Sequence, residues 1–245
     1  MTLQALKDCC RFLCFETDVE GFEVATHGGT LFVVEWEGVP YAITAKHNLH
    51  DFHWQDLTVT KTRTSTFLAG LTAVYYASQG TGAAQGSDIL DIAVVQFTSD
   101  VTSAFFEGTA FELREAHVRR SAPGEALTAY GALKEFSTIG DKLITPQFAD
   151  LGFVDKAPHP YDPALREAEG QWLHSDISDL AGLSGAPVYN NTQDGLCGMV
   201  VRGGINQDGL ARMHYVEMCD ILRLLRAVHE GRSSDGYVKS VAHPN

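Results

Sequence analysis

Ser184 stands between two glycines in the stretch Gly182-Leu-Ser-Gly-Ala-Pro187. Glycine permits backbone conformations that other residues avoid, and proline fixes φ where the chain leaves a turn. Such a turn can present the serine hydroxyl outward and direct nearby backbone N–H groups at one point. Acyl transfer to a serine requires both features, an exposed nucleophile and a preorganised oxyanion hole. Taken alone, the hexapeptide could also be a tight turn between two strands.

A serine nucleophile needs a base within hydrogen-bond reach and an acid that orients the base. Among ten histidines, His47 ends an expected strand, where a side chain can be held rigidly at a cleft. Asp91 lies in the apolar run 89–97, and a charge buried there would need a partner such as a histidine N–H. Asp88 is the second candidate acid. The order His47, Asp91, Ser184, with intervals of 44 and 93 residues, therefore suggests a nucleophile with its base and acid.

These blocks resemble those of trypsin-like serine proteases of the chymotrypsin fold. Thr44-Ala-Lys-His47 resembles the Thr/Ser-Ala-Ala-His block of that family, and Asp91-Ile-Ala-Val resembles its Asp-Ile-Ala-Leu block. The stretch 182–187 resembles its Gly-Asp-Ser-Gly-Gly-Pro block. Residues 196–203 resemble the strand that follows and holds the substrate backbone. The resemblance covers residues 25–228 and is closest to intracellular members of bacterial type.

The resemblance implies an all-β fold of two six-stranded antiparallel β-barrels with the active-site cleft between them. A short N-terminal helix and an amphipathic C-terminal helix would flank the barrels. His47 would be the general base, and Asp91 would fix its tautomer. The backbone N–H groups of Gly182 and Ser184 would form the oxyanion hole. The implied activity is that of a serine endopeptidase, and no cofactor or metal is expected.

The specificity pocket is less determined by the sequence. The resemblance implies Ser178 at its base, with Val201, Arg202 and Gly203 along one wall and the strand of His214 along the other. Asp176 and Asp179 would favour a basic residue at the cleavage site. In contrast, Arg202, Arg212 and His214 would favour an acidic one. Charges of solvent-exposed loops are the third interpretation.

Two departures from the family pattern bear on regulation. Asn48 follows the histidine where digestive members have a cysteine, and Leu183 precedes the serine where they have an aspartate. In zymogens that aspartate pairs with a new N-terminus, and Leu183 cannot make this pair. The sequence therefore predicts no zymogen switch of that kind. Control would depend on a regulatory protein partner, on oligomerisation, or on a mobile loop at 79–87 or 155–170.

Composition bounds the partners and the compartment. The 245 residues carry a net charge of −13, which argues against a nucleic acid or an anionic membrane as partner. The N-terminus lacks the pattern of a secretory signal, and no run approaches the roughly 18 apolar residues of a membrane span. Five cysteines, three of them within 9–14, do not indicate a disulfide framework. We expect a cytoplasmic protein whose partner is a protein or peptide substrate.

Periodicity indicates a helix over 3–15, an exposed strand over 58–67, a proline-containing surface loop over 155–170 and a helix over 217–229. The whole chain is then one protease unit in five parts: an N-terminal helical arm (1–20), a first β-barrel (21–113), a second β-barrel (114–216), a C-terminal helix (217–231) and a tail (232–245).

Three alternatives to an active protease remain. A catalytically silent protease fold could serve as a binding or scaffold module, but all three candidate residues are present. A serine esterase of the α/β-hydrolase type would need the order serine, acid, histidine, which the chain lacks. The three-residue spacing of His47, His50 and His53 could suggest a metal site, but it lacks a partner pattern of cysteines or carboxylates.

Overall fold

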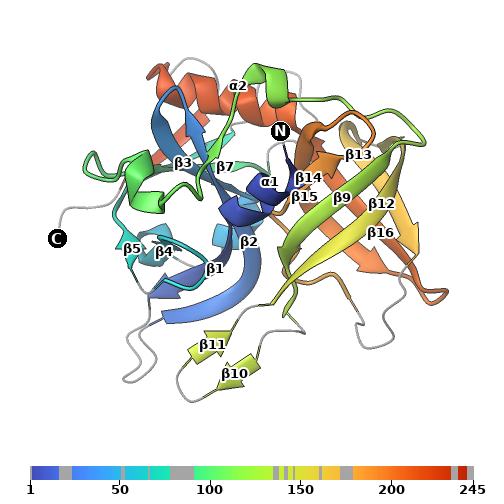
Figure 1. Cartoon of the computed structure of the whole chain (residues 1–245), viewed down its shortest axis with the longest axis horizontal. Helices are drawn as coiled ribbons and strands as arrows, with labels where there is room; N and C mark the ends of the chain where they lie inside the picture. Colours follow the sequence, from blue (N-terminus) through green and yellow to red (C-terminus); the bar gives the residue numbers. More distant parts are fainter. Residues whose placement is uncertain are drawn as a thin grey trace.

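The computed structural model describes residues 2–16, 24–50, 53–65, 67–77, 91–134, 138–140, 143–145, 147–159, 162–171, 179–232 and 237–241. Strands dominate, and they form two sheet-built halves that lie side by side (Figure 1). The expected residues Ser178, Asp176 and Asp88, the strand start at 89–90 and the loop 79–87 lie outside the described residues.

The first half is a curled sheet with the order β17-β6-β7-β3-β2-β1-β4-β5, and β8 pairs with β2. Only Gly70 separates β5 from β6, so these two segments are the arms of one bent strand that joins β4 to β7. With β5 and β6 counted as one strand, the curled sheet has six main strands, to which β8 and β17 are added. The bounds are β1 (Cys10–Glu16), β2 (Val24–Trp36), β3 (Val39–Thr44), β4 (Leu57–Thr60), β5 (Leu68–Ala69), β6 (Leu71–Ala77), β7 (Ala93–Phe97), β8 (Phe111–Glu112) and β17 (Tyr237–Val241).

The second half is a closed barrel with the order β12-β13-β16-β15-β14-β9. A separate two-stranded ribbon of β10 and β11 lies outside this ring (Figure 1). The bounds are β9 (Ala126–Ala132), β10 (Thr138–Gly140), β11 (Leu143–Thr145), β12 (Phe148–His159), β13 (Asp162–Gln171), β14 (Pro187–Asn190), β15 (Gly195–Ile205) and β16 (Leu210–Glu217).

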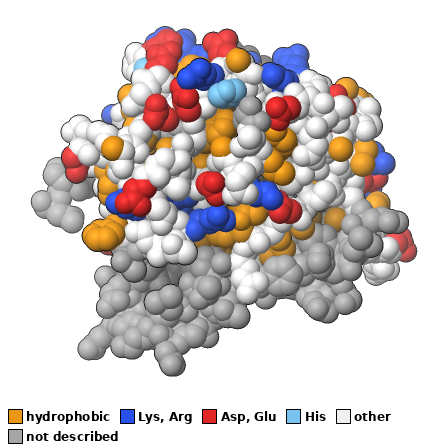
Figure 2. All heavy atoms as spheres, viewed as in Figure 1, with side chains coloured by type: hydrophobic (Ala, Val, Ile, Leu, Met, Phe, Trp, Pro, Cys, Tyr) orange, Lys and Arg blue, Asp and Glu red, His pale blue; other side chains and the backbone are white. Residues whose placement is uncertain are grey.

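Two α-helices accompany the sheets, α1 (Leu3–Cys9) and α2 (Met218–His229). The expected stripe of α2 is buried, and Gly231, at φ +65°, follows its end. This stripe joins side chains of both halves in one core, among them Tyr41 and Met199. Acidic and basic side chains lie interspersed along the edge where α2 runs (Figure 2). The all-β prediction with two barrels and two flanking helices is thus confirmed.

Three local expectations were wrong in detail. The N-terminal helix ends at Cys9, and residues 10–16 form β1 between β2 and β4. Nearly every side chain of β1 is buried, on one face of the sheet or the other. A central strand therefore needs apolar residues at the same positions as the stripe of an amphipathic helix, and the sequence pattern fits both. Regular pairing of the strand expected at 58–67 ends at Thr60, and Thr58 and Val59 are buried rather than exposed.

The segment 155–170 is largely a strand pair rather than a surface loop, because β12 and β13 pair across it. The ladder accommodates Pro158 where the register shifts between residues 158 and 159, a position at which a missing N–H costs little. In the described residues, no helix is long and apolar enough to cross a membrane.

Candidate active site

Asp91, His47 and Ser184 form one continuous chain of hydrogen bonds. The Oδ2 atom of Asp91 lies 2.5 Å from Nδ1 of His47, and Nε2 of His47 lies 2.7 Å from Oγ of Ser184. The backbone N–H of His47 donates to the other oxygen of Asp91, at 2.8 Å. Because the carboxylate holds both the backbone and the ring of His47, Nε2 faces the serine as the proton acceptor.

The first half supplies the acid and the base from neighbouring strands. His47 lies in a 3₁₀ turn (Lys46–Leu49) two residues after β3, and Asp91 lies two residues before β7. The strands β3 and β7 pair directly, with Thr44 opposite Ala93. Asp91 therefore flanks the strand rather than interrupting it, and its side chain is only 17% exposed. The sequence predicted that Asp91 lies beside His47, and the structure places it there, but before the strand rather than within it.

The second half supplies the serine on a turn that only glycine allows. Gly182 and Gly185 have φ of +96° and +87°. A Cβ atom on Gly185 would lie 1.9 Å from the carbonyl oxygen of Thr30 in the first half. The two halves therefore approach each other backbone to backbone directly beside the nucleophile.

Two backbone N–H groups on this turn are available to a ligand. Within the described part of the chain, the N–H groups of Gly182 and Ser184 donate no hydrogen bond. The carbonyl of Ala181 accepts a hydrogen bond of 2.8 Å from the N–H of Lys134. Because C=O and N–H point in opposite directions in a trans peptide, this bond turns the N–H of Gly182 away from Lys134. Such a pair of donors can stabilise a developing oxyanion.

Thr30 of β2 holds the serine turn from across the interface. Its N–H donates to the carbonyl of Ser184 at 2.9 Å, and its hydroxyl donates to the carbonyl of Gly182 at 2.8 Å. The same hydroxyl accepts from the N–H of Ala132 at 2.9 Å, and the side chain is fully buried. Thr44 in turn donates its hydroxyl to the carbonyl of Thr30 at 2.7 Å. The sequence analysis missed Thr30, because a threonine on a strand carries no distinguishing pattern.

Asn48, the residue that departs from the family cysteine, also contacts the turn. Its Nδ2 donates to the carbonyl of Ser184 at 3.0 Å and to Oγ1 of Thr44 at 3.1 Å. A Cβ atom on Gly29 would lie 2.9 Å from this amide, so the two residues fit together closely. A buried amide therefore links the residue after the histidine to the nucleophile turn.

Leu183, the second departure, is buried in the core of the second barrel. Its side chain is 1% exposed and belongs to the same cluster as Leu180 and Ala186. A Cβ atom on Gly131 would come within 3.1 Å of it, so the strand β9 lies close against it. Apolar packing thus anchors the turn at the position where an ion pair would otherwise act.

An open cavity of about 540 Å³ surrounds the serine. Its lining combines both halves: His47, Asn48, His50, Asp179, Leu180, Ala181, Gly182, Ser184, Val201, Arg202 and Gly203. The carbonyl of Val201 accepts a hydrogen bond of 3.0 Å from Oγ of Ser184. The structure thus brings the expected wall residues 201–203 to the serine. Leu180 lies against Gly203, where a Cβ would meet its side chain at 2.9 Å.

His214 and Arg212 line an adjoining cavity rather than the one at the serine. Burial lowers the pKa of His214, so its ring is neutral near pH 7. Nδ1 accepts from Nε of Arg202 at 3.3 Å, which leaves Nε2 to donate to Glu167 at 3.3 Å.

Solved structures with a similar fold are proteases. A thermostable serine protease, AL20, from an extremophilic microorganism aligns over 91% of this chain and 98% of its own, with a TM-score of 0.58 and 14% identity. A scabies mite inactivated protease paralogue, S-I1, aligns over 93% and 97%, with a TM-score of 0.62 and 13% identity. A tobacco vein mottling virus protease aligns over 97% and 88%, with a TM-score of 0.54 and 13% identity. No family model and no curated protein matches the sequence.

Proposed function

The chain has the chymotrypsin fold of serine proteases, and we propose on that premise that it is a serine endopeptidase that acts through an acyl-enzyme. The observation that carries the proposal is the unbroken series of hydrogen bonds from Asp91 through His47 to Ser184. Its order matches the roles of orienting acid, base and nucleophile.

In the first step, Nε2 of His47 takes the proton of Ser184 as Oγ attacks the carbonyl carbon of the scissile peptide. Asp91 stabilises the imidazolium that results. The N–H groups of Gly182 and Ser184 donate hydrogen bonds to the negatively charged oxygen of the tetrahedral intermediate and stabilise it. Collapse of the intermediate breaks the C–N bond, and the imidazolium protonates the leaving amine.

In the second step, water takes the place of the amine. Nε2 of His47 removes a proton from the water, which attacks the acyl carbon, and the same proton returns to Oγ of Ser184 as the acid product leaves. The open cavity of about 540 Å³ at the serine supports a protein or peptide substrate.

A fluorophosphonate probe, which reacts only with an activated serine, tests the proposal. The purified chain should become labelled, and the Ser184→Ala variant should not. Ser99→Ala removes an exposed hydroxyl elsewhere and should label like the wild type. Absence of labelling in all three proteins would contradict an active nucleophile.

A silent binding or scaffold module is the second candidate, and one comparison favours it. The scabies mite protein that shares this fold is described as an inactivated paralogue, so the fold can persist without activity. An intact series of hydrogen bonds at the serine argues for the enzyme in this chain. The labelling experiment separates the two candidates.

We also propose a cytoplasmic setting and control that does not use a zymogen ion pair. All five cysteines are free, which fits a reducing compartment. Among the described residues, Leu183, Thr30 and Asn48 hold the serine turn 182–187 through apolar packing and neutral hydrogen bonds. A regulatory protein would therefore act on access to the cleft rather than on formation of the turn.

A further inference from the structure

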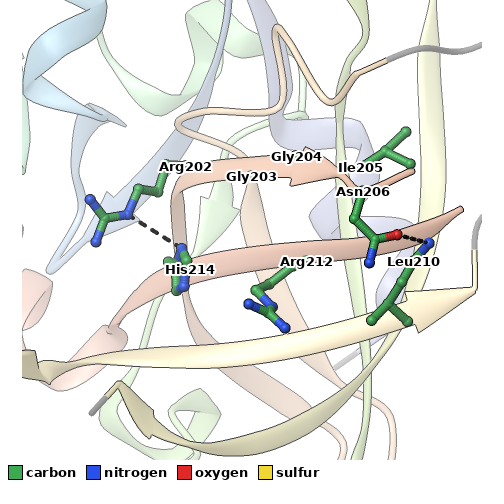
Figure 3. A pocket seen from close by; sticks show the side chains of 8 residues that line it. All are labelled: Arg202, Gly203, Gly204, Ile205, Asn206, Leu210, Arg212 and His214. Carbon is green, nitrogen blue, oxygen red and sulfur yellow. Dashed lines mark hydrogen bonds between the residues drawn. The ribbon is translucent and has the colours of Figure 1, made fainter. Parts of the chain in front are cut away.

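A second cavity of about 350 Å³ adjoins the one at the serine and shares Arg202 and Gly203 with it (Figure 3). Two arginines and one histidine face it from paired strands. The lining consists of Arg202, Gly203, Gly204, Ile205, Asn206, Leu210, Arg212 and His214.

Strand alternation explains why the charged side chains face this cavity. On β16, Ala211 and Met213 are buried in the barrel core, so Arg212 and His214 point to the outer face. On β15, Arg202 stands opposite His214, and Gly204 stands opposite Arg212. A Cβ on Gly204 would meet no atom within 4 Å, so this part of the floor is open.

Two guanidinium groups line the cavity, and no carboxylate lines it within the described residues. Acidic side chains of β13 hold one of these groups in place: Nε and Nη2 of Arg212 bind Glu169 at 3.2 and 2.7 Å, and Nε lies 3.3 Å from Glu167. Nη1 of Arg212 makes no hydrogen bond within the described part of the chain. The side chain is 51% exposed, so a donor of a fixed guanidinium remains within reach of solvent.

The edge of β15 connects this cavity to the nucleophile. Val200 of β15 still bonds with Gly185 and Ala186, and beyond it β15 pairs with β16 alone among the described strands. A substrate strand could add to the second edge of β15 from this point. Gly204 lies three residues after Val201, whose carbonyl contacts Ser184, a distance of about 10 Å along a strand. A side chain in the second cavity therefore belongs to a residue a few positions from the scissile bond.

We propose that this second cavity is a substrate subsite for a carboxylate side chain, Asp or Glu, two to four residues before the scissile bond. The proposal rests on the proposed endopeptidase activity, because it assigns the substrate class of that same site. Arg202 and Arg212 are the specificity-determining residues. The acidic residue lies in this subsite and not in the pocket directly beside Ser184.

Peptide substrates that differ only by Glu or Gln at each of the four positions before the scissile bond test the subsite. Wild type should cleave the Glu peptide with a kcat/KM about three- to tenfold higher at one of the positions two to four. Arg212→Gln should lower this ratio to about one. Arg223→Gln, which removes a side chain that is 73% exposed on α2, is the matched control and should retain the ratio. High salt should also reduce the preference, because the contact is partly exposed.

Binding to the Ser184→Ala variant, measured by anisotropy of labelled Glu and Gln peptides, gives a readout that needs no turnover. The Glu peptide should bind more tightly, and Arg212→Gln in the same background should remove the difference. Cleavage without any acid preference, or a preference only at the residue directly before the scissile bond, would overturn the subsite while the endopeptidase stands. Failure of both cleavage and fluorophosphonate labelling would instead count against the enzyme, and the binding measurement would still decide the subsite.

Discussion

Nδ2 of Asn48 donates a hydrogen bond of 3.0 Å to the carbonyl oxygen of Ser184. Asn48, which follows His47, thus holds the backbone of Ser184 across the interface between the two halves. Asn48 is 5% exposed, so this bond is shielded from water. The amide of Asn48 therefore helps to fix where the backbone of Ser184 lies relative to His47.

Replacement of Asn48 by Ala should therefore affect both stability and turnover. Loss of the amide leaves the carbonyl of Ser184 with only the Thr30 N–H and should lower the free energy of unfolding by about 1–3 kcal/mol. We expect kcat to fall about tenfold, measured with a peptide substrate well below the melting temperature. Asn191→Ala, on an exposed turn after β14, is the control. An unchanged kcat would show that Asn48 does not position the serine.

The hydroxyl of Thr30 should be required for turnover more than for substrate binding. Thr30→Val keeps the shape but leaves the carbonyl of Gly182 and the N–H of Ala132 without a buried partner. We expect kcat to fall about tenfold or more, with KM within about threefold, because the turn that carries the oxyanion donors is displaced. Thr30→Ser restores the hydroxyl and should recover most of the kcat. Equal losses in both variants would assign the effect to packing alone.

Asp91→Asn should leave the fold intact and abolish most of the activity. An amide at this position can present its NH₂ to Nδ1 of His47, which favours the tautomer that cannot accept the proton of Ser184. The expected loss in kcat is about 10⁴-fold, the order of magnitude for a catalytic histidine held in the wrong tautomer. Circular dichroism and the melting temperature should match those of the wild type. Retention of substantial activity would point to a different acid.

Leu183→Ala should destabilise the serine turn by removing its contact with the core of the second barrel. Removal of a side chain that is 1% exposed should cost about 2–4 kcal/mol of unfolding free energy and slow fluorophosphonate labelling. Leu13→Ala makes the same change in the core of the first half and is the matched control. That variant should lose comparable stability yet label at the wild-type rate. Equal labelling of the two variants would dissociate Leu183 from the turn.

Acidification should destabilise the folded chain through His214. Its pKa is lowered in the folded state, chiefly by burial, so the unfolded chain takes up a proton first as the pH falls. The contribution of neutral His214 is complete above the unfolded pKa of about 6.5 and decreases as the pH falls toward the folded pKa. Glu167, His159 and Arg202 face the ring and set the size of the effect. Melting temperature against pH should decline less steeply below pH 6.5 in His214→Gln, and parallel curves would refute the assignment.

Chain order and local pattern predicted three residues that the structure brings together, and the catalytic roles given to them stay predictions. His47 and Ser184 each occupy a short block whose residue types are restricted by a turn or a strand end. Asp91 followed from the cost of a lone carboxylate in an apolar run. Thr30 could not be found in this way, because its function arises from contacts with residues more than 100 positions away.

The same limit explains the wrong local assignments. The apolar residues of 10–16 fit the spacing of a helix and also that of a buried strand. Pairing with β2 and β4 decides for the strand, and the sequence pattern does not contain that information. Three prolines suggested a loop over 155–170. The β12 strand tolerates Pro158, which has no backbone N–H, because the pairing register shifts at that residue. The sequence could not place the side chains of Arg212 and His214 relative to the serine, because one residue of register decides which face of β16 they occupy.

Asp91 and His47 are attached to paired strands of one sheet, whereas Ser184 comes from the other barrel. The distance of 2.7 Å between Nε2 and Oγ is therefore set by how the two barrels dock, through the shared core with α2 and through Thr30 and Asn48. It follows that the reactivity of the Ser184 hydroxyl should depend on how the two halves are positioned relative to each other. A ligand or substitution at the far end of the interface that shifts one barrel by a fraction of an ångström would be registered as a change in labelling rate at Ser184.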